Sequence, residues 1–505
     1  MQKESKPTNI NKGIDEYHDR LKKLNALKKE GINPYPAKAK RDFLIAEILG
    51  DFIKLEKNKK QFYAVGRLRS IRAHGNLTFA HLQDGSGQIQ IAFSKTNIGA
   101  DNYKLLGKFL DIGDFIQIKG QVFKTHKGEK TIQVNEFKIL TKALRPLPDK
   151  WYGFKDEEER LRKRYLDILY NPEVQEMLNK KAKFWQAARD FFVQKGFIEV
   201  ETPVLENTTG GADARPFVTH HNALDIDVYL RISMGELWQK RLMVAGLEKT
   251  FEIGRQFRNE GMDAEHLQDY TQMEFYIAYA DYEKGMELVE EMYKYIAKAT
   301  FGTLKFTIRN FKVDLGKKWE RYDYCSTIKK YTGIDVLSLT GLGTNIKEIE
   351  KKLKKLGVEY DKKGFNITRA IDNLWKYCRC QIGGPGFLVN APIEISPLAK
   401  RDEKNPKVAQ RFQVLIAGSE LGNGYSELND PVDQAERFKE QQKLREAGDE
   451  EAQMYDREFV EALEYGMPPT CGFGMSERVF AFLMNKSMRE CQIFPLLRPR
   501  GESEQ

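Results

Sequence analysis

Cysteine is scarce in this sequence, and its scarcity limits the sites that it can form. Five cysteines in 505 residues cannot make a disulfide framework, and their odd number leaves at least one thiol free. Cys378 and Cys380 stand one residue apart, too close for a zinc knuckle, and no second Cys or His pair lies nearby. A structural role fits these two cysteines better than a metal site.

Long apolar runs are also missing. No stretch approaches the roughly 18–20 residues that a membrane span needs, and the first six residues lack the apolar core of a signal peptide. Prolines number only 17, while 41% of the residues are hydrophobic, which argues against wholesale disorder. We expect a protein without a membrane span or export signal, located in the cytoplasm.

Positive charge is what the sequence has in excess, and it is unevenly spread. The formal net charge is +9, from 82 Lys and Arg against 73 Asp and Glu. Residues 1–150 hold 29 basic and 16 acidic side chains, a net of +13, which leaves −4 for residues 151–505. This asymmetry suggests a module that binds a polyanion joined to a different unit, although many of these lysines would serve equally as a solvated face.

The basic first third begins with a predicted helix and continues as a predicted barrel. Leu21, Leu24 and Leu27 recur at helical spacing within residues 14–31, and Gly31 ends the pattern. Basic and aromatic residues then interleave along five short predicted strands, at 63–67, 77–82, 88–93, 115–120 and 131–134. This pattern suits an OB-fold, where aromatic rings stack on bases, but composition alone fits a generic β-barrel as well.

The predicted domain boundaries follow these changes of pattern. We expect a basic helical extension over residues 1–60, the barrel over 61–141, a linker over 142–172 and a larger domain over 173–505. Pro146 and Pro148 lie in the linker, because prolines two residues apart block both helix and strand pairing. Further helices are predicted over 156–169, 174–195, 282–300 and 345–356, the last within a helical insertion near 325–380.

Three segments of the larger domain carry unusual residue patterns. In the first, a helix ends at Gly196 and a strand is halted by Pro203, which alone has no functional content. In the third, Gly472 and Gly474 alternate and leave room for another backbone or a nucleotide to approach closely. Arg478 then stands where a strand would meet a helix, which suits contact with a phosphate, though a short Gly-x-Gly is weak evidence by itself.

The second segment combines charge with an aromatic ring. A strand is predicted to end with Arg258 and Glu260, and a return strand after a turn-rich loop carries Glu274 and Tyr276. Residues two apart on a strand share a face, so each pair is expected to project together. A surface hairpin held by salt bridges would show the same pattern.

Together and in this order, the three segments resemble the signature motifs of class II aminoacyl-tRNA synthetases. Other stretches are similar to the lysyl-tRNA synthetase family in particular, namely residues 140–150, 164–167, 210–225, 278–282 and 422–429. The resemblance covers about residues 15–500. It implies an α+β protein with a five-stranded OB-fold barrel that binds the anticodon. A catalytic domain follows, with an antiparallel sheet flanked by helices.

The resemblance implies a ligase that joins L-lysine to tRNA(Lys) for protein synthesis. ATP and lysine form lysyl-adenylate and pyrophosphate, and lysine then passes to the 3′ end of the tRNA. Catalysis requires positioning and charge neutralisation rather than a protein nucleophile. The implied contacts are Arg258 to the α-phosphate and lysine carboxylate, Glu260 to the adenine amino group, His266 to the outer phosphates, Tyr270 to the adenine ring and Arg478 to the γ-phosphate.

Lysine is favoured over related substrates by the glutamates at the family's amino-acid positions. A pocket for a side-chain ammonium needs buried carboxylates, because an unpaired buried charge costs several kcal/mol. The aspartyl and asparaginyl relatives share the three motifs, but these glutamates would serve an acidic or neutral substrate poorly. The implied lysine-binding residues are Gly211 and Glu236 at the α-amino group, Asn423 near the carboxylate, Tyr425 along the stem, and Glu274, Tyr276 and Glu427 at the ε-amino end.

The barrel residues can be matched to the family in the same way. Phe79 matches the aromatic that stacks on a base, and Gln90 matches the residue that reads the central anticodon uridine. Arg72 and Glu136 are expected as their neighbours.

The sequence departs from the family at four places. Gln413 stands where a carboxylate is usual, and the family's Mg²⁺ ions lie between that position and Glu420, so a neutral amide oxygen should bind the metal more weakly. The third motif is one residue short and lacks a glycine. The loop of residues 265–270 differs from the common one, and residues 230–236 contain one residue more than usual.

Two other functions remain as alternatives to tRNA charging. A paralogue could attach lysine to a protein, but such paralogues lack the barrel. A catalytically silent RNA-binding protein could keep the fold, although the retained motif arginines argue against it. The resemblance also implies a homodimer formed through the segment around Pro203.

Overall fold

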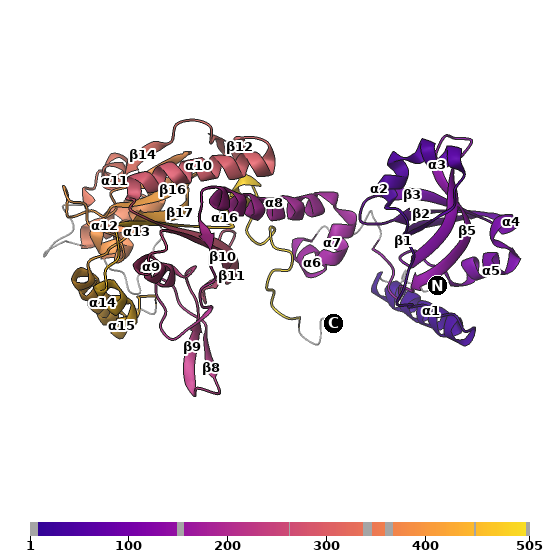
Figure 1. The fold of residues 1–505 in the computed structure, drawn as a ribbon, viewed down its shortest axis with the longest axis horizontal. Coiled ribbons are helices and arrows are strands. Elements are labelled where there is room, and N and C mark those ends of the chain that lie inside the picture. The colour runs from indigo at the N-terminus through magenta and orange to yellow at the C-terminus, as the bar shows by residue number, and fades with distance from the viewer. Residues whose placement is uncertain are drawn as a thin grey trace, which may run out of the picture. The chain divides into compact units, whose positions relative to one another are not determined.

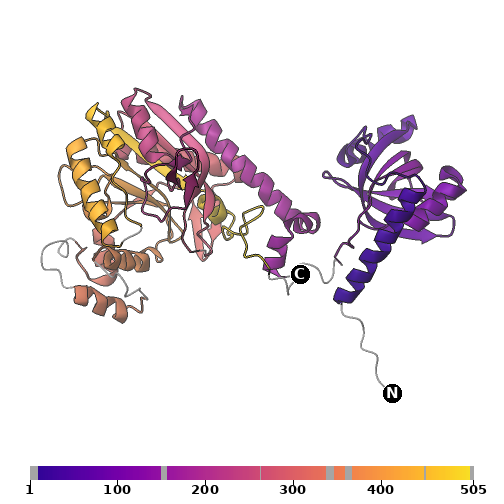
Figure 2. The same cartoon turned by 90° about the horizontal axis from the view of Figure 1, so that it is seen from below.

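The computed structural model describes residues 9–148, 156–261, 263–336, 346–358, 367–448 and 451–500. The chain divides into two compact units, Met1–Lys155 and Asp156–Gln505, shown as ribbons in Figures 1 and 2. Three predicted features lie partly outside the described residues: the first residues of the extension, the end of the proline-containing linker, and much of the helical insertion.

Five strands of the first unit close into a barrel in the order β1-β2-β3-β5-β4 (Figure 1). Neighbouring strands are antiparallel except for the parallel pair β3 and β5. Alternate side chains such as Phe62, Ala64 and Leu68 are buried inside, which is the period of two that the sequence shows. The predicted barrel is confirmed by strands β1 (Phe62–His74), β2 (Leu77–Gln83), β3 (Gln88–Ser94), β4 (Phe115–Lys124) and β5 (Lys130–Thr141).

Within the described residues of the first unit, five helices accompany this barrel. The predicted first helix is present, and it ends two residues before Gly31, whose φ of +74° favours glycine. Its Leu24 and Leu27 are buried. The helices are α1 (Asn9–Lys29), α2 (Ile45–Gly50), α3 (Phe52–Asn58), α4 (Lys95–Ile98) and α5 (Ala100–Phe109).

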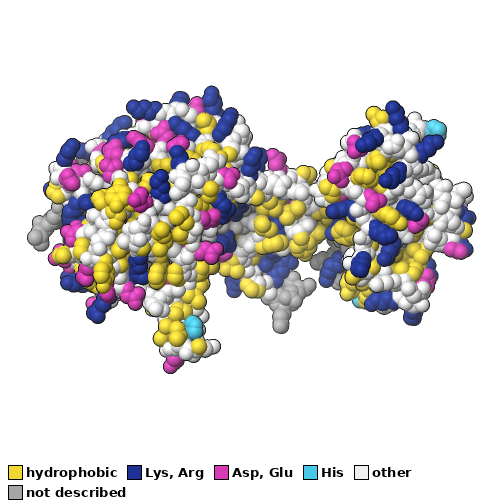
Figure 3. Space-filling view, viewed as in Figure 1, with side chains coloured by type: hydrophobic (Ala, Val, Ile, Leu, Met, Phe, Trp, Pro, Cys, Tyr) yellow, Lys and Arg dark blue, Asp and Glu magenta, His cyan; other side chains and the backbone are white. Residues whose placement is uncertain are grey.

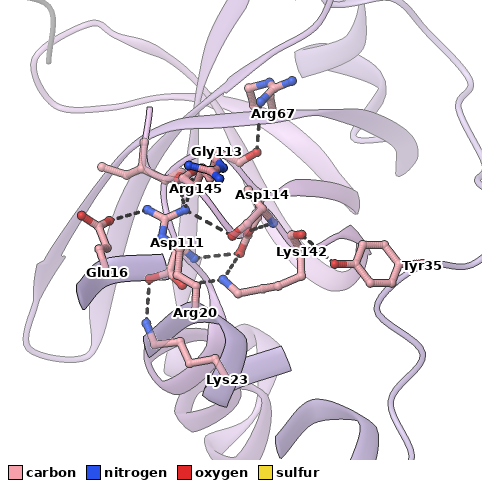
Figure 4. Close-up of polar contacts among 12 residues, drawn as sticks. Glu16, Arg20, Lys23, Tyr35, Arg67, Asp111, Gly113, Asp114, Lys142 and Arg145 are labelled. Atoms are coloured by element: carbon pink, nitrogen blue, oxygen red, sulfur yellow. Dashed lines mark hydrogen bonds and ion pairs between the residues drawn. The ribbon is translucent and has the colours of Figure 1, made fainter. Parts of the chain in front are cut away.

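A buried ionic cluster ties α1 to the barrel and to the residue that follows β5 (Figure 4). The ammonium of Lys142 contacts the carboxylates of Asp111 and Asp114, the latter at 2.8 Å. Lys23 of α1 reaches Asp111 at 2.6 Å, and Arg20 donates to the carbonyl of Ile112 at 3.0 Å. Lys142, the first residue of the predicted linker, is therefore packed within the first unit.

An eight-stranded sheet organises the second unit. Its order is β14-β15-β16-β17-β18-β11-β10-β6, and the expected antiparallel pairing holds through its centre. Each edge differs, because β6 pairs parallel with β10 and β14 with β15. The strands are β6 (Ile198–Glu199), β10 (Lys249–Phe257), β11 (Asp269–Ala278), β14 (Glu320–Asp323), β15 (Gly386–Val389), β16 (Arg411–Ile416), β17 (Ser419–Ser426) and β18 (Thr470–Ser476).

Two long helices, α8 (Pro172–Gln194) and α10 (Tyr282–Phe301), pack side by side against one face of this sheet (Figures 1 and 2). Aromatic rings fill the interface: Phe275 lies 5.2 Å from Phe192 of α8 and 5.9 Å from Phe473. Because side chains alternate along a strand, the residues on either side of Phe275 point to the opposite face. That face carries the polar residues described below.

The remaining elements complete the unit around the sheet. A three-stranded sheet and a β-hairpin stand beside it. Along the chain, α11, α12 and α13 follow β14 and precede β15, where the insertion is expected. These elements are β7 (Leu205–Glu206), β8 (Val218–His221), β9 (Ile226–Leu230), α9 (Glu236–Val244), β12 (Lys305–Ile308), β13 (Phe311–Asp314), α11 (Tyr324–Thr332), α12 (Ile346–Lys355), α13 (Ile367–Arg379), a 3₁₀ turn (Ile393–Ile395), α14 (Pro431–Glu446), α15 (Arg457–Glu464) and α16 (Arg478–Leu483). Cys378 is buried in the core of the insertion, whereas Cys380 is exposed.

The predicted linker of residues 142–172 divides between the two units. Its later residues form α6 (Glu157–Arg162) and α7 (Arg164–Tyr170), which belong to the second unit. The buried carboxylate of Asp167 accepts hydrogen bonds from Arg160 at 2.9 Å and Arg164 at 2.6 Å. Within the described residues, no helix is both long and apolar enough to cross a membrane.

One predicted strand is shorter than expected. The strand that was to carry Arg258 and Glu260 ends at Phe257, so these two residues begin a loop and do not share a strand face. The backbone amide of Arg258 donates to Gln268, and that of Asn259 donates to Arg215, at 2.8 Å each. These bonds turn the chain away from the sheet, and Glu260 is exposed.

Candidate active site

A cavity of about 390 Å³ opens on the sheet face opposite α8 and α10. Thirteen of the fourteen catalytic-domain residues predicted from the sequence line it, contributed by β11, β16, β17, α9, α16 and loops. They are Gly211, Glu236, Arg258, His266, Tyr270, Glu274, Tyr276, Gln413, Glu420, Asn423, Tyr425, Glu427 and Arg478. The fourteenth, Glu260, is exposed and does not line the cavity.

One end of the cavity contains three buried carboxylates. Glu236, Glu274 and Glu427 are 5%, 5% and 1% exposed. Glu274 accepts hydrogen bonds from the Tyr276 hydroxyl at 3.0 Å, from Gln272 at 2.6 Å and from the Met234 amide at 3.1 Å. Glu236 accepts one from the Tyr425 hydroxyl. Each carboxylate is thus held in place by the wall of the cavity.

Lys240 also reaches this cluster, and the sequence reasoning missed it. Its ammonium lies 2.8 Å from Glu236 and 2.6 Å from Glu427, and the side chain is 1% exposed. Lys240 follows Glu236 by four residues in α9, a spacing that places both side chains on one helix face. That spacing was a signal for the first contact, whereas the contact with Glu427 depends on where the fold places α9 relative to the residue that follows β17.

Burial changes the proton affinity of this cluster. It raises the pKa of Glu274 to about 7, with the nearby charge of Glu236 adding to the effect. It raises the pKa of Glu427 to about 8, although the charge of Lys240 acts in the opposite direction. Burial alone would lower the pKa of Lys240, but the charges of Glu236 and Glu427 outweigh it and raise that pKa. A cation entering the cavity therefore meets carboxylates that ionise near neutral pH.

The opposite end of the cavity is rich in cationic side chains. Arg478 begins α16, and its guanidinium donates to the backbone carbonyl of Glu420 and lies 3.5 Å from His266. His266 in turn contacts Asp263 at 2.8 Å. Such a cluster suits an anionic group with several oxygens, because the guanidinium fork matches phosphate geometry.

Glu265 is an acidic residue at this cationic end that the sequence reasoning did not single out. It pairs with Arg309 from the β12–β13 turn, lies 3.8 Å from Arg478, and accepts a hydrogen bond from Ser419 at 3.3 Å. Burial alone would raise its pKa, but Arg309 and Arg478 hold the pKa below its usual value. Glu265 therefore remains an anion that occupies the two arginines.

Other predicted residues of the cavity have contacts of their own. Arg258 is anchored by its Nε, which donates to the carbonyl of Ile232 at 3.3 Å. Asn423 accepts a hydrogen bond from Arg411 at 2.8 Å across β16 and β17. Arg411, two residues before Gln413 on the same strand, also lines the cavity and was not predicted. Glu420 accepts a hydrogen bond from the indole of Trp375.

The four predicted anticodon residues do not all lie together on the barrel. Strand pairing sets Phe79 beside Arg72 of β1 on the outer face. Gln90 pairs in register with His81, which lies two residues along β2 from Phe79. The Gln90 side chain is buried, however, and donates to the Thr131 hydroxyl at 2.9 Å. Glu136 instead forms an ion pair with Lys119 at 2.9 Å, in the β4–β5 pair of strands.

Comparison with known proteins identifies the family. Residues 156–498 match the model for class II tRNA synthetases of the D, K and N type, and residues 63–140 match the OB-fold nucleic acid binding domain. The chain belongs to the class II tRNA synthetases. It is 46% identical to the lysine–tRNA ligase of Thermoanaerobacter sp. strain X514 over 96% of each chain.

Other relatives of this class II synthetase carry the same name. The lysine–tRNA ligase of Pelotomaculum thermopropionicum is 44% identical over 95% of this chain and 94% of the relative. That of Thermotoga maritima is 43% identical over 96% of both chains.

The glycines of the third motif in this synthetase make room for side chains of the carboxylate cluster. A Cβ atom at Gly472 would lie 2.3 Å from a carboxylate oxygen of Glu427 and 2.4 Å from the ring of Tyr276. One at Gly474 would lie 2.9 Å from Glu274. The close approach expected at these glycines is therefore made by the cavity's own side chains. Arg478 lies at the strand–helix junction as predicted, although the motif is one residue short.

Proposed function

We propose that the chain is a lysine–tRNA ligase that activates L-lysine with ATP and transfers it to the 3′ end of tRNA(Lys) in protein synthesis. The observation that carries the proposal is the pairing of three buried glutamates at one end of the cavity with an arginine and a histidine at the other. The glutamates suit the amino groups of lysine, and the cationic end suits a triphosphate. The relatives' name and the family agree with this division.

The first step joins the amino acid to the α-phosphate. A carboxylate oxygen of lysine attacks the α-phosphorus, a P–O bond forms, and the bond to the leaving pyrophosphate breaks. Arg258, which lines the cavity, neutralises the charges of the two reacting anions, while His266 and Arg478 hold the outer phosphates and Tyr270 covers the adenine. The 3′-terminal ribose hydroxyl of tRNA then attacks the lysyl carbonyl, and AMP leaves. The predicted contact of Glu260 with adenine requires the loop after β10 to turn inward.

The carboxylate cluster selects lysine in this proposal. Glu236 and the backbone of Gly211 take the α-amino group, while Glu274, Glu427 and Tyr276 take the ε-amino group. Tyr425 covers the stem, and Asn423 lies near the carboxylate. An aspartate or asparagine side chain would bring no ammonium group to Glu274, whose donors Tyr276, Gln272 and Met234 are all neutral. Leaving this buried carboxylate without a positive partner costs about 1–3 kcal/mol or more.

Mg²⁺ fits the residues present if it arrives with the nucleotide. Within the described residues, no group of three or more His, Cys, Asp or Glu side chains is arranged to hold a metal ion. Glu420 and Gln413 both line the cavity and offer one carboxylate and one amide oxygen. Mg²⁺ usually binds through one or two carboxylates plus substrate phosphates, and it would neutralise phosphate charge there.

The barrel recognises the anticodon in this proposal. Phe79, beside Arg72 on the outer face, stacks on a base, and the neighbouring cationic side chains contact phosphates. Gln90 reads the central base once its bond to Thr131 is exchanged for one to the base. Glu136 serves as a more distant neighbour.

A homodimer and a cytoplasmic location complete the proposal. Exposed apolar side chains gather on β6 to β9 and on the segment after Pro203, and Figure 3 shows hydrophobic side chains along the β8–β9 hairpin. They are Ile198, Val204, Leu205, Val218, Leu224 and Ile226. A patch of this kind marks an interface.

Sedimentation of a Val218→Glu/Leu224→Glu double variant tests this interface, and the variant should be monomeric. The control is Tyr465→Glu, at an exposed residue outside the patch, which should stay dimeric.

The activity itself is tested by ATP–pyrophosphate exchange with each of the twenty amino acids, followed by tRNA charging. Exchange with lysine and charging of tRNA(Lys) are expected. Exchange without tRNA charging would instead support a ligase that modifies a protein, and no exchange would support a silent RNA-binding protein.

A further inference from the structure

Lys240 is a buried cation inside the pocket that the proposed function gives to a cationic substrate. It reaches the cluster from α9 and lies along two aromatic rings, with its ammonium 5.4 Å from the centre of Tyr425 and 5.9 Å from that of Phe459. Both distances are within the range of cation–π attraction. The ammonium is thus held by two aromatic rings as well as by two carboxylates.

The contacts of Lys240 connect two substrate subsites. Its ammonium contacts Glu236, assigned above to the α-amino group, and Glu427, assigned to the ε-amino group. The Tyr425 hydroxyl donates to the same Glu236 oxygen that Lys240 contacts, which leaves the other oxygen of Glu236 for a ligand. Glu274, the third carboxylate, is held by the neutral donors Tyr276, Gln272 and Met234.

The charges in the pocket balance only when Lys240 is counted. Three carboxylates and one ammonium leave two negative charges once the carboxylates are ionised. A lysine molecule brings two ammonium groups, at its α and ε ends. Without the fixed cation, one buried carboxylate would have to keep a proton or stay unpaired when lysine is bound, and either costs binding free energy.

We infer that Lys240 is a positioning residue of the amino-acid pocket: its ammonium offsets the negative charge of Glu236 and Glu427 and holds both carboxylates in place, so that these two take the two ammonium groups of one lysine. The inference rests on the proposed function, because it assigns those subsites. Lys240 itself touches neither the reacting carboxylate nor the nucleotide end of the cavity.

The first test removes the charge and keeps the stem. In Lys240→Met, the dissociation constant of radiolabelled lysine in equilibrium dialysis should rise about tenfold or more. A tenfold rise is the same change in free energy as a shift of one pKa unit. The KM for lysine should rise equally while the KM for ATP stays within about twofold. Lys240→Arg keeps the charge and should lose less.

A matched control separates this role from general stability. Lys181 is also largely buried and pairs with a buried carboxylate, Glu477, away from the Lys240 cluster. Lys181→Met should lower Tm without raising the dissociation constant for lysine. If Lys181→Met weakens lysine binding as much as Lys240→Met, the effect is one of folding and the inference is overturned.

Chemical rescue tests the charge directly. Lys240→Ala leaves space for a short alkylammonium ion between Glu236 and Glu427, so propylammonium should restore lysine binding at least threefold, whereas propanol should not. Wild type should show only competition from propylammonium.

Equal rescue by both molecules, or an unchanged lysine dissociation constant in Lys240→Met, overturns the inference. Wild-type binding of lysine without any lysine-dependent exchange would contradict the proposed function and leave the binding result for Lys240 intact.

Discussion

Arg478 lies 3.8 Å from the carboxylate of Glu265, at the end of the cavity that suits the triphosphate. The same carboxylate pairs with Arg309. A nucleotide that binds the guanidinium of Arg478 must therefore compete with an anion supplied by the protein. If ATP binds there as proposed, Glu265 adds to the electrostatic cost of its binding.

Neutralising Glu265 should tighten ATP binding. In Glu265→Gln, Arg478 and Arg309 lose an anionic partner and become available to phosphate, so the KM for ATP in pyrophosphate exchange should fall about two- to fivefold, the range of a partly exposed ion pair. The KM for lysine should not change. Glu283→Gln removes a comparable pair with Arg321 elsewhere and serves as the control. A raised KM for ATP in Glu265→Gln would show that Glu265 assists the nucleotide.

Restoring a carboxylate at residue 413 should lower the Mg²⁺ requirement. Gln413 offers one neutral oxygen in the cavity that Glu420 also lines, and cation affinity in oxygen sites follows the number of charged ligands. The Mg²⁺ concentration for half-maximal exchange should fall about threefold or more in Gln413→Glu and rise in Gln413→Met. Binding of Mn²⁺ with ATP gives a second measurement. Identical Mg²⁺ titrations for all three proteins would exclude residue 413 from the metal site.

Removing the buried charge of Glu274 should change how stability depends on pH. The pKa of Glu274 rises from 4.5 to about 7 on folding, so the native state binds this proton more tightly than the unfolded chain. That contribution to stability is complete below about pH 4.5 and is lost as pH rises to about 7. The Tm should therefore fall between pH 5 and pH 8 by a larger amount in wild type than in Glu274→Gln. The difference between the two falls should be about 2 °C or more. Parallel Tm curves would contradict the raised pKa.

Local patterns in the sequence were enough to predict most of the fold. The alternation of buried and exposed residues along Phe62–His74 defines a barrel strand, and the spacing of Leu24 and Leu27 defines the first helix. Alternation around the buried Phe275 placed Glu274 and Tyr276 on one strand face, whereas most other cavity residues were matched through the resemblance to the lysyl-tRNA synthetase family. Such signals depend on neighbours within a few residues.

The features that were missed depend on contacts between distant segments. Lys240 of α9 meets Glu427, which follows β17 far along the chain, and Glu265 meets Arg309 across 44 residues. The strand end at Phe257 is set by the hydrogen bonds of the next two amides to Gln268 and Arg215, which placed Glu260 outside the cavity. The buried position of Lys142 follows from Asp111 and Asp114, which no local pattern reveals.

Removing the ring of Phe79 should weaken tRNA binding without affecting amino-acid activation. A stacked base contributes about 1–3 kcal/mol, so Phe79→Ala should raise the KM for tRNA(Lys) about tenfold or more, while lysine-dependent pyrophosphate exchange without tRNA stays at the wild-type rate. Tyr63→Ala is the matched control, because Tyr63 lies on β1 in register with Lys119 rather than beside Arg72. A tRNA KM that rises equally in both variants would point to lost barrel stability. An unchanged KM in Phe79→Ala would remove this residue from the anticodon site, and the outer face would then have to bind RNA through its cationic side chains alone.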